Sequence, residues 1–238
     1  MKKYFVYIKT VLFLIFIGLI LGFTSKRNAM RKIENIDIVF ANEDNLFLTH
    51  QMVDNLLIQN KKRVRNQAKS LINLQELEQI VQSHPMVETA QVSVGVVGDL
   101  KVSVIQRKPL AREYSQNGVF YIDSKGLKMP LSKSYSARVP IINNKNGFIK
   151  SEEVFPLIQK IHQDEFLTKL VVTIKKDSEG YWLQTRFNHQ QVLLGELNNT
   201  SDKLKKLKVF YNYMENDSLS ATFKKIDLQY NNQVVCSK

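Results

Sequence analysis

The stretch that most constrains the fold runs over residues 73–112, where an amphipathic helix, a proline and two alternating strands follow one another. Asn73 stands at the N-cap position, and Glu76 follows at the spacing of a capping box. The helix must end near His84, because Pro85 has no N–H to donate and favours extended backbone before it. The apolar positions recur at helical spacing, at Leu74, Leu77, Ile80 and Val81.

The two alternating runs after Pro85 predict a β-hairpin, and its register follows from the turn. A two-residue loop of Gly98 and Asp99 would place apolar residues opposite polar ones. A three-residue loop over residues 97–99 gives one apolar face instead. We therefore expect an odd-length loop, or a bulge with the same effect. The expected pairs are Val96 with Leu100, Val94 with Val102, and Val92 with Val104.

An apolar run at residues 4–23 contains one charge, Lys9. At about 1.5 Å per residue it spans roughly 30 Å, which just suffices to cross the hydrocarbon of a bilayer. Residues 11–23 alone would cover only about 20 Å and would suit a signal-peptide core. Lys9 lies near enough to the end to snorkel, and no small-x-small cleavage site follows. The pattern favours a retained anchor within residues 1–32.

The formal charge of +12 is concentrated at the anchor. Seven of the 34 basic residues lie in the first 32 positions, where there are no acids, and the remaining 27 face 22 acidic residues. That balance is ordinary for a folded domain, so a nucleic-acid partner is not expected. The positive charges after the run outnumber those before it, so a positive-inside count alone would place the large domain in the cytoplasm.

Two domains are expected after the anchor. A strand at residues 33–40 and a helix capped by Thr49 precede the helix and hairpin, which gives a β-α-α-β-β domain over residues 33–112. Residues 113–238 read as a second, mostly antiparallel β domain with flanking helices. The fold class is therefore α+β. Its strands are expected at residues 119–123, 127–130, 139–142, 169–175, 181–187, 191–194 and 226–230.

Two helices are expected in the second domain. One carries Leu157, Ile158 and Ile161, and Pro156 fits its first position but not a deeper one. The other is capped by Ser201 and has an apolar side with Leu204 and Leu207. Its other side is expected to face solvent and carries Lys203, Lys205 and Lys206.

Catalytic and metal-binding motifs are not found. The four histidines form no HExxH motif and no ligand pair at helical spacing, and there is no GxSxG, Walker or GxGxxG motif. A single cysteine, Cys236, has no partner for an internal disulfide. The basic segment at residues 61–69 lacks interleaved aromatic residues and reads as a solvated loop, with anionic lipid or a polyanion as the alternative. We expect no catalytic residue, metal, cofactor or small-molecule substrate.

Residues in both domains carry a family resemblance. The order of elements up to residue 107 resembles a POTRA domain, and its motifs resemble those of the FtsQ/DivIB cell-division proteins. The motifs are His84-Pro85-x-Val87-x-x-Ala90-x-Val92, Leu100-x-Val102-x-Val104 and Arg107-Lys108-Pro109-Leu110-Ala111. Phe120-Tyr121-Ile122-Asp123 with Gly126 and Pro130, and Ile226-Asp227-Leu228-Gln229-Tyr230, are similar to the start and the last strand of that family's β domain.

The resemblance implies a single-pass protein of the cell inner membrane, with a cytoplasmic N-terminus and a periplasmic C-terminal domain enriched at the division septum. It overrides the charge count on orientation. It also implies a non-enzymatic scaffold that links the FtsB/FtsL pair to the septal peptidoglycan synthase machinery. The alternatives are a POTRA-containing adaptor of transport or outer-membrane assembly, and a membrane-anchored hydrolase.

Partner binding is expected at the C-terminal strand by β-strand addition, with unpaired backbone groups offered to a partner peptide. Tyr230 is the first candidate for a side-chain anchor, because an aromatic residue can bury area and keep its hydroxyl bonded. The alternative is that Ile226, Leu228 and Tyr230 merely pack on the helix at residues 201–214, and this packing is favoured for the two aliphatic residues. The expected partner-binding residues are Ile226, Asp227, Leu228, Gln229, Tyr230 and Val234.

Overall fold

The computed structural model divides into two compact units, Met1–Gln106 and Arg107–Lys238. The expected division after Arg112 lies later, within a strand of the second unit. Arg107 belongs to that unit because its guanidinium contacts the Asp123 carboxylate at 2.7 Å, and both side chains are largely buried. The structure describes residues 2–41, 46–59, 62–214 and 222–238.

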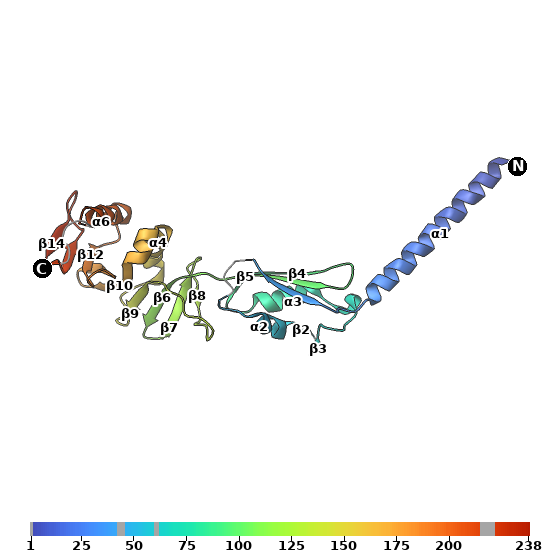
Figure 1. Ribbon diagram of the computed structural model, residues 1–238, viewed down its shortest axis with the longest axis horizontal. Helices are drawn as coiled ribbons and strands as arrows, with labels where there is room; N and C mark the ends of the chain where they lie inside the picture. Colours follow the sequence, from blue (N-terminus) through green and yellow to red (C-terminus); the bar gives the residue numbers. More distant parts are fainter. Residues whose placement is uncertain (1, 42–45, 60–61, 215–221) are drawn as a thin grey trace. The chain divides into compact units, whose positions relative to one another are not determined.

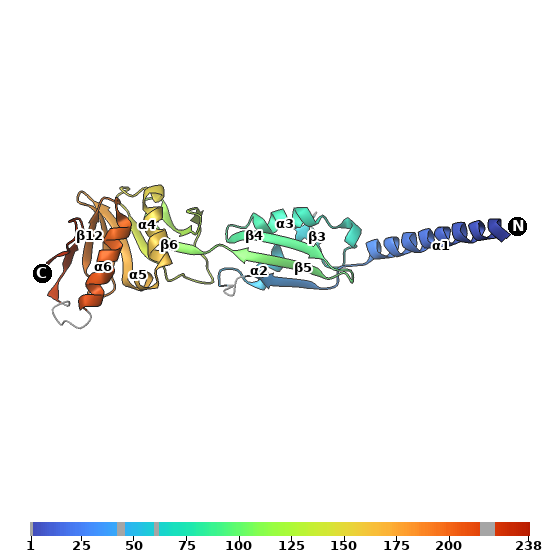
Figure 2. The same cartoon turned by 90° about the horizontal axis from the view of Figure 1, so that it is seen from above.

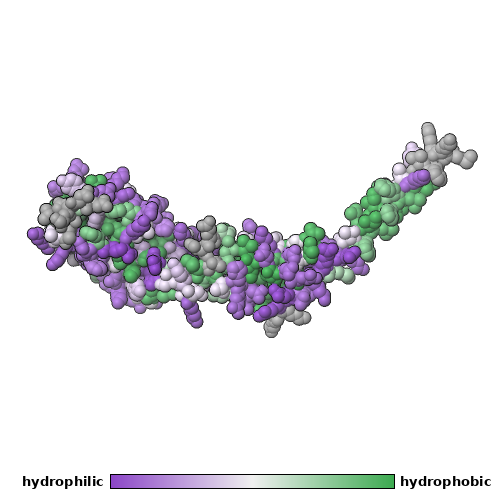
Figure 3. Space-filling view, viewed as in Figure 1, coloured by the Kyte–Doolittle hydropathy of each residue, from purple (hydrophilic) through white to green (hydrophobic). Residues whose placement is uncertain are grey.

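The chain begins with a long helix, α1 (Lys2–Met30). Its segment Tyr7–Met30 is long and apolar enough to cross a membrane. Figure 3 shows an apolar surface along most of α1, whereas hydrophilic residues cover much of the two folded units. The helix is consistent with the expected single-pass anchor.

The rest of the first unit is a three-stranded sheet with two helices, in the order β1-β5-β4. β1 runs parallel to β5, and β4 runs antiparallel to it. Thr49 and Asn73 cap α2 and α3 as expected, since their side chains accept hydrogen bonds from the backbone N–H of Met52 and Glu76. The elements are β1 (Ile36–Phe40), α2 (His50–Leu56), β2 (Ile58–Gln59), β3 (Lys62–Arg63), a 3-10 turn η1 (Lys69–Leu71), α3 (Leu74–Gln82), β4 (Val87–Val94) and β5 (Leu100–Gln106).

The hairpin register has the expected parity but not the expected loop length. Val94 pairs with Leu100 and Val92 with Val102, so the loop contains residues 95–99 rather than 97–99. The longer loop is closed by its own hydrogen bonds, from the Gly95 N–H to the Asp99 carbonyl at 2.8 Å and from the Gly98 N–H to the Gly95 carbonyl at 3.2 Å. One apolar face results, as an odd-length loop requires.

The second unit is a nine-stranded sheet among the described residues, in the order β14-β13-β12-β11-β10-β9-β6-β7-β8. Most neighbours are antiparallel, as expected, and the parallel pairs are β6/β9, β9/β10 and β12/β13. The strands are β6 (Pro109–Ser115), β7 (Gly118–Asp123), β8 (Lys128–Met129), β9 (Ile141–Asn144), β10 (Val171–Asp177), β11 (Gly180–Thr185), β12 (Gln191–Gly195), β13 (Lys225–Asp227) and β14 (Val235–Ser237).

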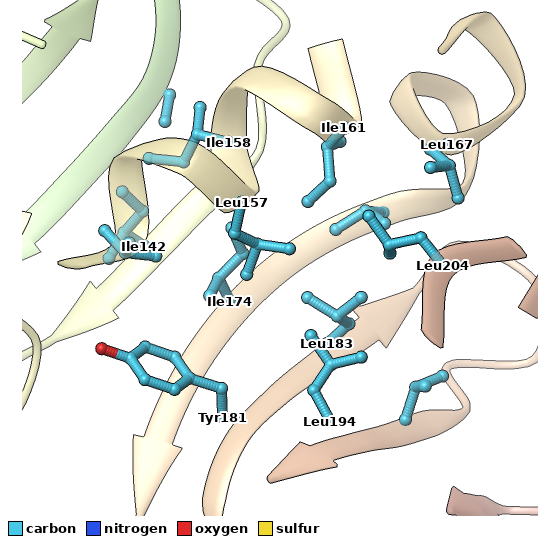
Figure 4. Close-up of a cluster of buried hydrophobic side chains, with 14 of the residues drawn as sticks. Ile142, Leu157, Ile158, Ile161, Leu167, Ile174, Tyr181, Leu183, Leu194 and Leu204 are labelled. Atoms are coloured by element: carbon cyan, nitrogen blue, oxygen red, sulfur yellow. The ribbon is translucent and has the colours of Figure 1, made fainter. Parts of the chain in front are cut away.

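Three helices, α4 (Ser151–Gln163), α5 (Glu165–Leu170) and α6 (Thr200–Met214), lie on one face of this sheet (Figures 1 and 2). Their apolar sides form the core with the strands below. Figure 4 shows Leu157 and Ile161 of α4 directed toward the side of the sheet that carries Ile174 and Leu183. All four side chains are almost fully buried.

Three expected boundaries in this unit are corrected by the structure. α4 begins at Ser151, so Pro156 lies inside the helix and removes one backbone hydrogen bond. The strand expected at residues 169–175 begins at Val171, because α5 occupies the preceding residues and is capped by Asp164. α6 begins at Thr200, two residues before Asp202, where a helix capped by Ser201 would start.

Gly98 provides a test of how the β4–β5 loop is seated. A Cβ at Gly98 would lie 2.6 Å from the Lys32 carbonyl oxygen, and the residue has φ +100°. Gly118 is a matched control, since it has φ +115° but nothing within 4 Å of a Cβ.

Gly118→Ala should therefore cost only the backbone strain, about 1 to 3 kcal/mol. Gly98→Ala should cost more, because the Lys32 backbone must also move. Urea unfolding of the chain in detergent, with hydrogen exchange assigning the change to each unit, measures both. Equal losses of stability for Gly98→Ala and Gly118→Ala would show that the β4–β5 loop can move away from Lys32 at no additional cost.

Candidate functional site

The strand expected to bind a partner lies inside the sheet. β13 pairs with β12 on one side and with β14 on the other, so Ile226 stands between Val192 and Cys236. The prediction that this strand offers unpaired backbone groups is therefore wrong. A parallel strand on one side and an antiparallel strand on the other satisfy its backbone.

The edge of the sheet is β14 instead. It ends the strand order, and no strand in the described part of the chain pairs with its outer side. The sequence offers one signal for it, the apolar pair Val234 and Val235 after Asn231-Asn232. Asn232 has φ +57°, which is the left-handed backbone that asparagine tolerates in a turn. β14 therefore folds back beside β13 through this turn.

The six expected binding residues fall into three groups, which are buried, half-buried and exposed. Ile226 and Leu228 are fully buried in the core with Leu204 and Leu207 of α6, which is the packing alternative. Asp227 is half-buried, and its carboxylate accepts a hydrogen bond from the Gln229 N–H at 2.9 Å. Gln229 and Tyr230 are exposed, and Val234 is half-buried against the core.

Two lysines of α6 do not face solvent as expected. Lys203 is buried, and its ammonium donates to the carbonyls of Leu194 at 2.9 Å and Glu196 at 2.7 Å, and to Asn198 Oδ1 at 2.8 Å. Burial lowers the pKa of Lys203, and the charge of Lys206 acts in the same direction. Lys203 thus fastens the β12–α6 connection.

Lys206 holds the C-terminal segment. Its ammonium donates to the carbonyl oxygens of Leu228 at 2.8 Å and Tyr230 at 2.5 Å. These two carbonyls lie just after β13, where the chain leaves the ladder. The lysine therefore fixes the start of the turn that leads to β14.

A third lysine ties α6 to the neighbouring helix. Lys208 forms an ion pair with Asp164, the residue that caps α5. The hydrogen bond from Lys208 is the main cause that holds the pKa of the Asp164 carboxyl below its usual value. α6 is thus anchored to the β12–α6 connection, to the C-terminal turn and to α5.

A groove of about 720 Å³ lies between α6 and the C-terminal turn. Its apolar side is formed by Val209, Phe210 and Tyr213 of α6, and Val209 and Tyr213 are strongly exposed. Its other side is lined by Leu228, Gln229 and residues 231–234, four of which carry side-chain amides. The combination of exposed apolar side chains, amides and the adjacent edge of β14 suits a peptide.

Reactive chemistry is not assembled at this edge. Burial raises the pKa of the Cys236 thiol, which lowers the fraction of the nucleophilic thiolate. Within residues 2–41, 46–59, 62–214 and 222–238, no three His, Cys, Asp or Glu side chains are grouped to hold a metal ion. What the arrangement offers is a surface for binding.

The family model described as FtsQ/DivIB, C-terminal related, matches residues 108–237, which is more than half of the chain. The chain belongs to the FtsQ/DivIB family. A POTRA-like domain model matches residues 31–105. These matches confirm the resemblance and the α+β class, and they assign the chain to a family of cell-division scaffold proteins that is generally non-enzymatic. A search of the curated proteins finds no match.

Lys206→Met should loosen the C-terminal turn of this FtsQ/DivIB member. The loss of two partly exposed hydrogen bonds, each of about 0.5 to 1.5 kcal/mol net, is expected to lower the free energy of unfolding by about 1 to 3 kcal/mol. Amide exchange in residues 229–237 should rise more than exchange elsewhere in the second unit.

Lys205→Met is the matched control. The Lys205 side chain is strongly exposed, and its ammonium makes one long ion pair, with Asp202 at 3.9 Å. This substitution should change neither the free energy of unfolding nor the amide exchange of residues 229–237 measurably. Equal effects of the two substitutions would contradict the role given to Lys206.

Proposed function

We propose that the chain is a single-pass membrane scaffold of the bacterial cell-division machinery. Its second unit, outside the cytoplasm, captures the FtsB/FtsL pair and links it to septal peptidoglycan synthesis. The observation that carries the proposal is the edge of β14, which is unpaired among the described residues and lies next to the groove along α6. The family supports a protein–protein role in cell division.

A partner strand adds to β14 rather than to β13. β14 has three residues, so it offers few ladder bonds, each of about 0.5 to 1.5 kcal/mol net. Micromolar affinity requires about 8 kcal/mol. Backbone pairing therefore supplies the alignment of the partner, and side-chain anchors supply most of the affinity.

The anchors are the exposed residues around the edge. Tyr230 remains the first candidate for a side-chain anchor. Its side chain is half exposed, and its backbone carbonyl is fixed by a hydrogen bond from Lys206. Val235 of β14 and Tyr213 of α6 add exposed apolar area. Ile226 and Leu228 contribute through the core instead, because their side chains are not accessible to a partner.

We infer the membrane orientation from the family resemblance rather than from the charge count. The N-terminus is cytoplasmic, α1 crosses the inner membrane, and both folded units lie in the periplasm, concentrated at the septum. α1 supports a single span by its length and composition. The basic residues after the span, Lys26, Arg27, Arg31 and Lys32, then lie on the side that a positive-inside count disfavours.

An adaptor of transport or outer-membrane assembly is the second candidate, since a POTRA-like domain is found in the first unit. The FtsQ/DivIB-related match over residues 108–237 favours cell division. The two candidates differ in where the protein acts and in what it binds.

Tyr230→Ala should weaken capture of FtsB and FtsL at least about ten-fold if Tyr230 is a hot spot of about 1.4 kcal/mol or more. Phe148→Ala is the matched control. Both aromatic side chains are similarly exposed, at 50% and 59%, but Phe148 follows β9, far from β14 in the strand order.

Co-purification of FtsB and FtsL with each variant from membranes measures the effect, and thermal unfolding checks the fold. Unchanged co-purification with Tyr230→Ala, or an equal loss with Phe148→Ala, would count against the assigned edge.

The cellular role is tested by imaging an N-terminally tagged chain in the bacterium that encodes it. A division scaffold should gather at mid-cell, and its depletion should produce filaments. Association with a β-barrel or a secretion channel without filamentation would favour the adaptor.

A further inference from the structure

The β4–β5 loop, residues 95–99, presents apolar side chains at an unexpected place. Val96 and Val97 are 77% and 68% exposed, although they continue the apolar pattern of the hairpin. The five-residue loop turns them out of the sheet. Both side chains are therefore open to contact from outside the sheet.

The loop is fastened to the end of α1. Arg31 Nη1 donates to the Val96 carbonyl at 3.0 Å, and Gly98 lies so close to the Lys32 carbonyl that a Cβ would not fit. Lys69 Nζ bridges the two segments, with donations to the Gly95 carbonyl at 2.9 Å and to Asn28 Oδ1 at 3.1 Å. The loop thus lies at the level of residues 28–32.

Helix geometry places that level at the membrane surface. The apolar run ends at Phe23, so at about 1.5 Å per residue Asn28 lies about 7 Å and Arg31 about 12 Å beyond the hydrocarbon. The headgroup layer is about 5 to 7 Å thick on each side of the hydrocarbon. Asn28, to which Lys69 connects the Gly95 end of the loop, therefore lies at the outer edge of the headgroups.

The charges nearby have the sign that anionic lipid attracts. Lys26, Arg27, Arg31 and Lys32 follow the apolar run without an intervening acid, and Lys69 lies against the loop. Asp99 is the acidic group of the loop, and it accepts a hydrogen bond from Asn35 Nδ2 at 3.2 Å. Basic residues therefore predominate around Val96 and Val97. Two more exposed apolar side chains lie in the adjoining segments, Met30 in α1 and Leu71 in η1.

We propose that the β4–β5 loop rests on the anionic headgroups of the membrane that α1 enters, with Val96 and Val97 against the outer surface of the headgroup layer and the basic residues around them paired with lipid phosphates. Apolar side chains with flanking cations bind lipid surfaces in this way. The contact seats the POTRA-like domain on the bilayer. It rests on the proposed single-pass anchor but on no division partner.

The test uses the full chain in nanodiscs, with Cys236→Ser to remove the native thiol. An environment-sensitive fluorophore is attached to Val96→Cys, and lipids spin-labelled near the headgroup serve as quenchers. Gln82→Cys is the matched control, because this exposed position ends α3, just ahead of β4, and β4 separates it from the loop by about 26 Å at about 3.3 Å per residue.

In phosphatidylglycerol nanodiscs, quenching at position 96 should exceed that at position 82 by at least about two-fold, and it should fall in phosphatidylcholine. Equal quenching at the two positions overturns the proposal. Equal quenching at position 96 in both lipids overturns its anionic component. A chain that does not enter nanodiscs contradicts the anchor itself, and therefore the proposed function as well.

Discussion

The C-terminal edge of this protein depends on how α6 holds the segment beneath it. β13 and β14 are three-residue strands, too short to be stable as an isolated hairpin. Their position is fixed by Ile226 and Leu228, which are buried under Leu204 and Leu207, and by the Lys206 ammonium on the two carbonyls that follow β13. The edge that we propose as the partner-binding surface therefore depends on α6 and the Lys206 ammonium as much as on the sheet.

Sequence patterns predicted the local structure well where a single physical cause dominates. Asn73 and Thr49 cap their helices because a side-chain oxygen there satisfies an N–H that the helix cannot. The β4–β5 hairpin has an odd-length loop because burial on one face forbids the other parity. The loop length was not predictable in the same way, since it depends on contacts with Lys32 and Lys69 that lie far away in sequence.

The candidate site was harder to predict, because its lysines and its short strands lack the sequence patterns that usually identify buried residues and strands. Lys203 and Lys206 look like solvent-facing residues, but backbone carbonyls brought in by the fold satisfy their charge. β6 was missed because Glu113 breaks its apolar run, yet that buried carboxylate accepts hydrogen bonds from Asn144 Nδ2 at 2.7 Å and Ser151 Oγ at 3.0 Å. β14 has only three residues and follows a turn, so the alternation of apolar and polar residues that identifies a strand could not be recognised there.

Because β12 pairs with β13 in parallel, the strands of the second unit join the sheet in a fixed order during synthesis. β13 reaches its place only after the chain has crossed over through α6, and β14 has no neighbour until β13 is in place. A nascent chain synthesised as far as α6 contains most of the core of the second unit but lacks β13 and β14. The surface proposed to bind a partner is thus absent until synthesis has passed the crossover, so that incomplete molecules would not compete for that partner.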